Sequence, residues 1–238
     1  MAFRLPTLLA CRADPRENSM AEHRDFYHRH LPHWQPQGAT FFVTYRLKDS
    51  LPNTVIETLR AERELAKRAI ASLSLEKREE QDDLDERRSF GKWDDFLDRA
   101  ETGPKWLSES LIAEITREAL HYRDNREYHL YAFCIMSNHV HVVFEPLTSK
   151  SDWQSDLQQP NLPLQKIMQS LKRHTARKSN ELLSREGAFW QDESYDRVIR
   201  DNNEFLRIIH YVLNNPIKAG LVAKWEDWPR SYCKPGIL

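Results

Sequence analysis

Short apolar runs rich in β-branched and aromatic residues predict three strands. They are residues 38–47 (GATFFVTYRL), 127–136 (EYHLYAFCIM) and 139–146 (HVHVVFEP). Only Ser137 and Asn138 separate the last two, so we expect a tight hairpin between them. A further short strand or turn is expected within 188–201.

A helical spacing of apolar residues predicts four helices, over 50–88, 106–124, 163–183 and 202–222. The first is long for a compact domain, so we expect it to break or project. The last should end before Pro216, because proline lacks the amide hydrogen that a helix interior needs. The polar or irregular segments predict loops, and they are 20–37, 148–161 and the aromatic segment from 225 onward.

The order of these elements predicts an α+β fold, with a ferredoxin-like antiparallel sheet, helices on one side of it and a charged helical insertion. With 238 residues, of which 40% are hydrophobic, the chain can bury a good core as one domain with elaborations. No apolar run approaches the ~18 residues of a membrane span, so we expect no membrane partner. Three scattered cysteines without a CxxC pair predict a reducing, cytoplasmic location.

The net charge of −1 conceals two helical stretches of opposite charge. Residues 76–101 carry 11 acidic and 6 basic side chains, a net charge of −5, and we interpret them as a solvated helix face. Residues 163–185 carry 6 basic side chains and 1 acidic side chain, a net charge of +5. This helix could contact DNA phosphates, although an ordinary exposed surface is an equal alternative. Its candidate DNA-binding residues are Lys166, Lys172, Arg173, Arg177 and Lys178.

Two copies of a His-x-His pattern differ in their surroundings. His28 and His30 lie in a polar, proline-rich segment, and we interpret them as solvated arm residues. His139 and His141 lie in a predicted strand, where residues two apart point to the same face and the alternate positions are apolar. Two parallel imidazoles there could bind a metal ion or could be hydrogen-bonded sheet histidines, and the spacing alone favours neither.

In the segment HYVLNNP, Tyr211 and Asn215 are four residues apart and share one helix face. A tyrosine hydroxyl beside a metal-polarised phosphate can attack phosphorus and form a phosphotyrosine. The asparagine carbonyl could then be a third ligand for Mg²⁺ or Mn²⁺. The alternative is a core tyrosine and a helix-capping asparagine, and without the histidine pair we would favour it.

Five blocks of the sequence, in this order, resemble the REP-associated tyrosine transposases of the HUH single-tyrosine transposase superfamily. They are HLPHWQPQGATFFVTYRL, FCIMSNHVHVVFEP, LQKIMQSLKRHTARKSN, FWQDESYDRVIRDNNEF and YVLNNPIKAGLV. The resemblance covers residues 25–230 and implies a single domain with an RRM-like catalytic core, in which about 55–105 looks like an insertion. Residues 1–24 are then a flexible N-terminal extension, and 231–238 are a C-terminal tail.

The resemblance also implies roles for particular residues. His139 and His141 match the HUH metal ligands, and Tyr211 matches the nucleophile. Asn215 matches the third metal ligand, although superfamily relatives often have glutamine there. Tyr195 is a rival nucleophile, but we expect it on a strand or turn, without an amide four residues later.

The implied activity is cleavage and rejoining of single-stranded DNA at REP-like hairpins, as in DNA transposition and recombination. It would use Mg²⁺ or Mn²⁺ and a 5′-phosphotyrosine, without ATP, in the cytoplasm at the nucleoid, as a monomer or homodimer. Two alternatives stay open. One is a non-catalytic regulator that binds hairpin DNA on the same fold, and the other is a metal-dependent hydrolase that uses the histidine pair without a covalent step.

Overall fold

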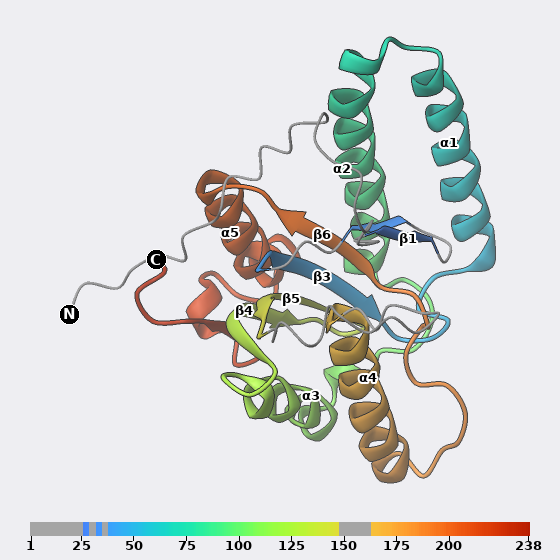
Figure 1. Cartoon of the computed structure of the whole chain (residues 1–238). Coiled ribbons are helices and arrows are strands. Elements are labelled where there is room, and N and C mark those ends of the chain that lie inside the picture. The colour runs from blue at the N-terminus through green and yellow to red at the C-terminus, as the bar shows by residue number, and fades with distance from the viewer. Residues whose placement is uncertain (1–25, 29–31, 35–37, 148–162) are drawn as a thin grey trace, which may run out of the picture.

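An antiparallel sheet of five strands, in the order β6-β3-β5-β4-β7, forms the centre of the computed structural model, which describes residues 26–28, 32–34, 38–147 and 163–238. The strands are β3 (Thr40–Arg46), β4 (Tyr128–Ile135), β5 (His139–Pro146), β6 (Tyr195–Ile199) and β7 (Ser231–Cys233). β5 lies in the middle, paired with β3 and β4 (Figure 1). The predicted α+β class with an antiparallel sheet is confirmed.

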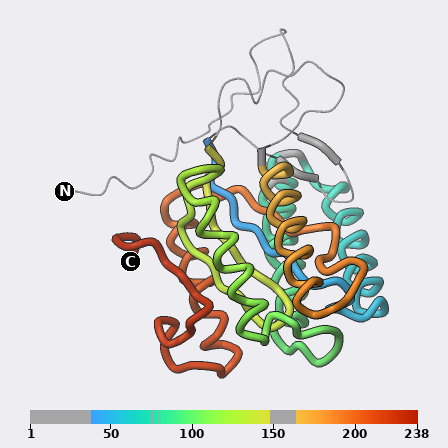
Figure 2. Tube along the Cα trace, turned by 90° about the horizontal axis from the view of Figure 1, so that it is seen from below, coloured from blue at the N-terminus to red at the C-terminus, as the bar shows by residue number. Residues whose placement is uncertain are grey.

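Helices cover both faces of this sheet, so the prediction of helices on one side was wrong. α3 (Ser110–Arg123) and α4 (Pro163–Leu182) lie side by side on one face (Figure 2), and α5 (Asn202–Lys218) packs on the other. Along β3, Phe41 and Val43 join the first core while Phe42 joins the second. Because both faces of the central strands are apolar, each needs its own cover.

α1 (Asn53–Ala71) and α2 (Leu75–Arg99) form a helical hairpin next to β6 (Figure 1). The chain breaks between them at residues 72–74, as expected for a segment too long for one helix. Arg197 of β6 donates hydrogen bonds to Asp83 of α2 at 2.6 Å and to Glu204 of α5 at 2.8 Å. Arg87 of α2 also pairs with Glu204 at 3.6 Å. Ion pairs therefore attach the hairpin to the edge of the sheet and to α5.

α5 continues through Pro216 to Lys218, past its predicted end. Proline leaves the carbonyl four residues earlier, that of Val212, without its usual amide donor. The side chain of Asn215 compensates, because its Nδ2 donates to the Val212 carbonyl at 3.4 Å and to the Tyr211 carbonyl at 3.0 Å. The helix can therefore complete a last turn that the proline rule excluded.

Two segments predicted to be irregular contain short strands. β1 (Phe26–His28) pairs with β2 (Pro32–Trp34), and β7 adds to the sheet beside β4. The predicted extension at 1–24, the loop at 148–161 and His30 lie outside the described residues. Within the described ranges, no helix is long and apolar enough to cross a membrane.

Candidate metal centre and nucleophile

β5 brings the imidazoles of His139 and His141 together on one face of the sheet. Both side chains are fully buried, and their Nε2 atoms are 2.9 Å apart. Two neighbouring ligands of an octahedral ion with bonds of about 2.1 Å would lie about 3 Å apart. The histidine pair therefore has a separation that suits two ligands of one metal ion.

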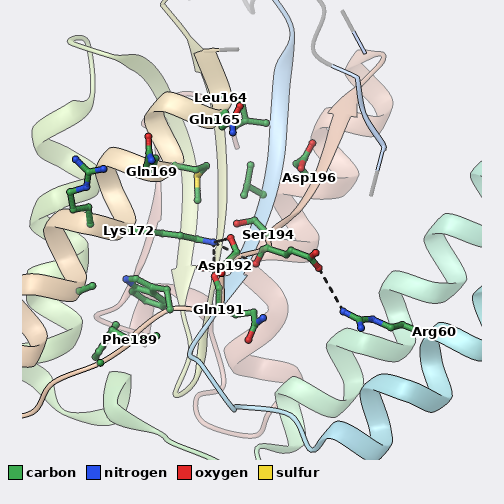
Figure 3. A pocket seen from close by; sticks show the side chains of 18 residues that line it. Arg60, Leu164, Gln165, Gln169, Lys172, Phe189, Gln191, Asp192, Ser194 and Asp196 are labelled. Carbon is green, nitrogen blue, oxygen red and sulfur yellow. Dashed lines mark hydrogen bonds and ion pairs between the residues drawn. The ribbon is translucent and has the colours of Figure 1, made fainter. Parts of the chain in front are cut away.

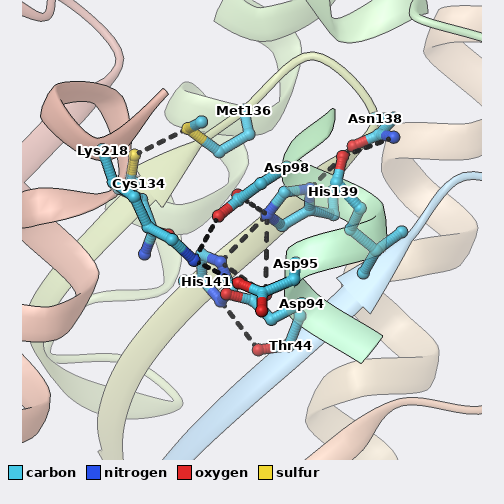
Figure 4. Close-up of polar contacts among 12 residues, drawn as sticks. Thr44, Asp94, Asp95, Asp98, Cys134, Met136, Asn138, His139, His141 and Lys218 are labelled. Carbon is cyan, nitrogen blue, oxygen red and sulfur yellow. Dashed lines mark hydrogen bonds and ion pairs between the residues drawn. The ribbon is translucent and has the colours of Figure 1, made fainter. Parts of the chain in front are cut away.

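The outer nitrogen of each ring has its own partner (Figure 4). Nδ1 of His139 lies 2.7 Å from Oδ1 of Asn138, whose Nδ2 donates to the carbonyl of Leu97 in α2 at 3.1 Å. Nδ1 of His141 lies 2.8 Å from the hydroxyl of Thr44. Because Asn138 accepts through Oδ1, His139 carries its proton on Nδ1 and leaves Nε2 as a ligand atom.

A carboxylate from the helical hairpin completes the cluster (Figure 4). Asp94 of α2 is 1% exposed, and its Oδ1 lies 3.3 Å from Nε2 of His141 and 3.9 Å from Nε2 of His139. This oxygen is buried without a hydrogen-bond partner, and burial raises the pKa of the carboxyl group. Two imidazole nitrogens and one carboxylate oxygen form a donor set that fits a divalent metal ion.

Three more charged residues lie around this cluster, and they are Asp95, Asp98 and Lys218. Oδ1 of Asp98 lies 3.7 Å from Nε2 of His139, and burial together with the charge of Asp94 raises the pKa of Asp98 to about 6. Lys218 of α5 pairs with Asp98 at 3.0 Å and with Asp95 at 2.6 Å. With one lysine beside three carboxyl groups, the centre is electrostatically suited to a cation.

Tyr211 of α5 points at the same carboxylate, because its hydroxyl donates a hydrogen bond to Oδ2 of Asp94. Burial and the nearby Asp94 charge raise the pKa of Tyr211. The half-buried side chain also lines a cavity of about 270 Å³ with His210, Asn214 and Trp225. The structure thus brings the predicted nucleophile and the predicted histidine ligands together around Asp94.

Asn215 lies one turn beyond Tyr211 and is 1% exposed. Its Nδ2 is used within its own helix, whereas its Oδ1 is buried and has no hydrogen-bond partner. A buried carbonyl oxygen without a hydrogen-bond partner is unusual, and an amide oxygen is a ligand type that divalent cations accept. Its role as third ligand stays a prediction.

Tyr195, the rival nucleophile, is the first residue of β6, as expected for a strand position. Its ring stacks on Phe90 of α2 with centroids 4.2 Å apart, and burial raises the pKa of its hydroxyl. No hydrogen bond between Tyr195 and Asp94 is formed within the described residues, so the geometry favours Tyr211.

The basic residues of α4 do not lie in similar environments. Lys172 reaches across a cavity of about 820 Å³ and donates to the carbonyls of Gln191 and Asp192 at 2.9 Å and 3.0 Å (Figure 3). Burial lowers the pKa of Lys172 to about 7. The other four predicted DNA-binding residues are exposed, and they are Lys166, Arg173, Arg177 and Lys178.

Asp94 and Asn138 did not emerge from the sequence as site residues. The interpretation of 76–101 as a solvated face is wrong for Asp94. One signal could have shown this, because Phe90, Trp93 and Leu97 form an apolar stripe at helical spacing and Asp94 falls within it. An acidic residue within an apolar stripe is buried with it and needs a partner.

Comparisons with known proteins agree with the sequence blocks. Residues 104–215 match the family described as Transposase IS200 like. A REP-associated tyrosine transposase of Haemophilus influenzae is 28% identical over 100 residues, which are 42% of this chain and 56% of that protein. The chain thus spans about half the length of this curated relative. The resemblance inferred from the sequence is confirmed, and the α1–α2 hairpin lies outside the residues matched by the family.

A solved structure was also found, that of a REP-associated tyrosine transposase bound to a REP hairpin. It is 15% identical, with 89% of this chain and 82% of that chain covered and a TM-score of 0.46.

Proposed function

Because this chain is similar to the IS200-like and REP-associated tyrosine transposases, we propose that it is a metal-dependent endonuclease and strand-transferase of single-stranded DNA. The observation that carries the proposal is the position of Asp94. One of its carboxylate oxygens faces the histidine pair, and the other accepts the hydrogen bond of the Tyr211 hydroxyl. A metal centre and a nucleophile thus share one carboxylate.

His139, His141 and Asp94 would hold a divalent ion, with Oδ1 of Asn215 as a further oxygen donor. We propose Mg²⁺ or Mn²⁺, because these ions accept oxygen ligands beside imidazole. Once bound, the ion supplies positive charge that polarises a DNA phosphate. Asn138 and Thr44 hold the rings so that both Nε2 atoms face this position.

The hydroxyl oxygen of Tyr211 attacks the phosphorus atom of the scissile phosphate, and its proton passes to Oδ2 of Asp94. A bond forms between the tyrosine oxygen and the 5′-phosphate, and the bond to the 3′ oxygen breaks. The leaving 3′ oxygen takes up a proton and becomes a free hydroxyl. Attack by another 3′-OH on the phosphotyrosine reverses these steps and joins strands without ATP.

The proposed substrate is a REP-like hairpin with single-stranded flanks. The five sequence blocks and the named Haemophilus influenzae relative support this choice. The exposed basic residues of α4 would contact DNA phosphates.

The test is cleavage of a labelled REP-like hairpin with Mn²⁺, followed by denaturing electrophoresis to detect a protein–DNA adduct. The matched variants are Tyr211→Phe and Tyr195→Phe, which each remove one hydroxyl. We expect wild type and Tyr195→Phe to form the adduct and Tyr211→Phe to form none. Cleavage without any adduct would instead support a hydrolase, and an adduct lost only in Tyr195→Phe would move the nucleophile to β6.

A non-catalytic regulator that binds hairpin DNA is the second candidate. It is favoured by the hydrogen bond that holds the Tyr211 hydroxyl against the buried carboxylate of Asp94. High affinity for the hairpin with no cleavage in Mg²⁺, Mn²⁺, Zn²⁺ or Co²⁺ would support this function.

A further inference from the structure

A third cavity, of about 360 Å³, lies between the α1–α2 hairpin and the sheet. α1 contributes Arg60, Arg63 and Lys67, and α2 contributes Phe90 and Trp93. The sheet side is formed by Thr44, Arg46 and Tyr195, among others. No catalytic role proposed above uses this space, and its helical walls lie outside the residues matched by the transposase family.

The cavity shares a wall with the proposed metal centre. Thr44 lines it, and the Thr44 hydroxyl lies 2.8 Å from Nδ1 of His141. Phe90 also lines it, with its ring centroid 6.5 Å from that of His141 and 5.9 Å from that of Tyr211. When a DNA strand is bound at Tyr211, a nucleotide next to the scissile phosphate can therefore reach the cavity.

Positive side chains outnumber negative ones in the lining. Two of the four cations already have acidic partners, because Arg60 lies 4.0 Å from Glu193 and Lys67 lies 3.2 Å from Glu64. Arg46 is over the ring of Trp93 at 5.9 Å. Arg63 forms no hydrogen bond or ion pair with the residues that the structure describes. The charge of Arg63 acts at longer range on Glu86 and Tyr195, so its guanidinium can still donate hydrogen bonds to a phosphate that enters the cavity.

The aromatic side chains offer flat apolar surface next to these cations. Phe90 and Tyr195 stack on each other, and Trp93 lines the cavity one residue before the metal-facing Asp94. Cationic grooves with aromatic platforms are the combination by which proteins hold unpaired nucleotides. The volume is also in the range of small ligand sites, roughly 300–1,000 Å³.

We propose that this cavity binds one unpaired nucleotide of the DNA strand adjacent to the scissile phosphate. The base lies against Phe90 and Trp93, and the phosphate pairs with Arg63. This inference rests on the proposed function for the presence of single-stranded DNA at Tyr211. It gives the α1–α2 hairpin a role in selecting DNA, in addition to supplying Asp94.

The test measures DNA binding without cleavage, in the full chain carrying Tyr211→Phe and without metal. Fluorescence anisotropy follows a labelled hairpin whose single-stranded flank carries an abasic site at each position in turn. We expect one flank position where loss of the base weakens binding on the order of tenfold. Adding Trp93→Ala should remove most of that penalty, and an unchanged penalty would overturn the base contact.

Charge reversal on α1 provides an independent arm with a matched control. Arg63→Glu places the new charge in the cavity, whereas Arg68→Glu makes the same change on an exposed part of the same helix. We expect Arg63→Glu alone to weaken binding and to reduce the salt slope by about 0.7, the value for one single-strand phosphate. Equal effects of both variants would mean general charge attraction and would overturn the site.

These results do not depend on catalysis, so they separate the inference from the proposed function. If wild type never cuts DNA but the abasic penalty depends on Trp93, the proposed function fails and the nucleotide site holds. If wild type cuts DNA but no flank position shows a penalty, the proposed function holds and the nucleotide site fails. Binding of free deoxynucleoside monophosphate with the same Arg63 dependence, without such dependence for DNA, would make the cavity an effector site and overturn the proposal.

Discussion

β5 and α2 deliver side chains to the same centre, but different forces hold the two elements in place. β5 is paired with β3 and β4, so a backbone ladder on each side fixes His139 and His141. α2 is attached through side chains, which include the Arg197–Asp83 ion pair and the hydrogen bond from Asn138 to the Leu97 carbonyl. Elements held in this way can open locally without unfolding the sheet. The histidine pair is therefore preformed, whereas the carboxylate is present only while the hairpin is docked.

The largest effect is expected at the rigid element. His141→Ala removes one of the two imidazoles from a central strand that cannot rearrange to replace it. We expect Mn²⁺ affinity, measured by isothermal titration calorimetry, to fall by more than about 100-fold, and DNA cleavage to be lost. Near wild-type Mn²⁺ affinity in a folded variant would show that the metal does not bind at β5.

The docking of the hairpin depends on Arg197, which is 8% exposed and bridges Asp83 and Glu204. Arg197→Met leaves these carboxylates without their main buried partner, so we expect unfolding in urea to show a loss of about 3 kcal/mol. Hydrogen exchange should accelerate in α1 and α2 more than in β5. Arg200→Met is the control, because Arg200 is exposed and pairs with Asp83 at 3.3 Å. Uniform acceleration across the sheet would contradict a separately held hairpin.

A smaller effect is expected from the contact behind His141. Thr44→Val keeps the shape of the side chain but removes the hydroxyl that lies 2.8 Å from Nδ1 of His141. Outer contacts of this kind usually change metal affinity by 10- to 100-fold, and we expect about tenfold weaker Mn²⁺ binding. An unchanged affinity would mean that the sheet alone orients the ring.

The smallest effect is expected from Asp83, the acidic partner of Arg197 in the contact between α2 and β6. Burial raises the pKa of Asp83, but the hydrogen bond and the charge of Arg197 outweigh burial and lower this pKa below its usual value. The folded state therefore binds the proton less readily than the unfolded chain, and the stabilisation is present above the unfolded pKa of about 4 and lost as the pH falls through the folded pKa. Asp83→Asn should destabilise less than Arg197→Met at pH 7. The difference from wild type should narrow below about pH 4, and a constant difference would contradict the charge effect.

The same contrast explains what the sequence could predict. The strands and the histidine pair follow from local alternation, because residues two apart in a strand must share a face. Asp94 is 45 residues before His139 and belongs to a helix that is mostly charged, so its burial depends on how the hairpin docks. The sequence signal for such a tertiary contact is weak, and here it is the apolar stripe around residues 90–97.

The end of α5 shows a similar limit. The proline rule considers only the backbone and predicts a stop before Pro216. The side chain of Asn215 donates to the carbonyl that the proline leaves free, and the helix extends to Lys218. The placement of helices on both faces of the sheet also required knowing that the strands are apolar on both sides.

The most direct test of this account is the Mn²⁺ affinity of Asp94→Asn, measured by calorimetry beside wild type and Asp82→Asn. Asp82 lies exposed on the same helix, so its variant makes the same chemical change away from the centre. We predict that Asp94→Asn binds Mn²⁺ about 100-fold more weakly while Asp82→Asn matches wild type. Equal affinity of all three proteins would contradict the claim that the helical hairpin supplies a metal ligand.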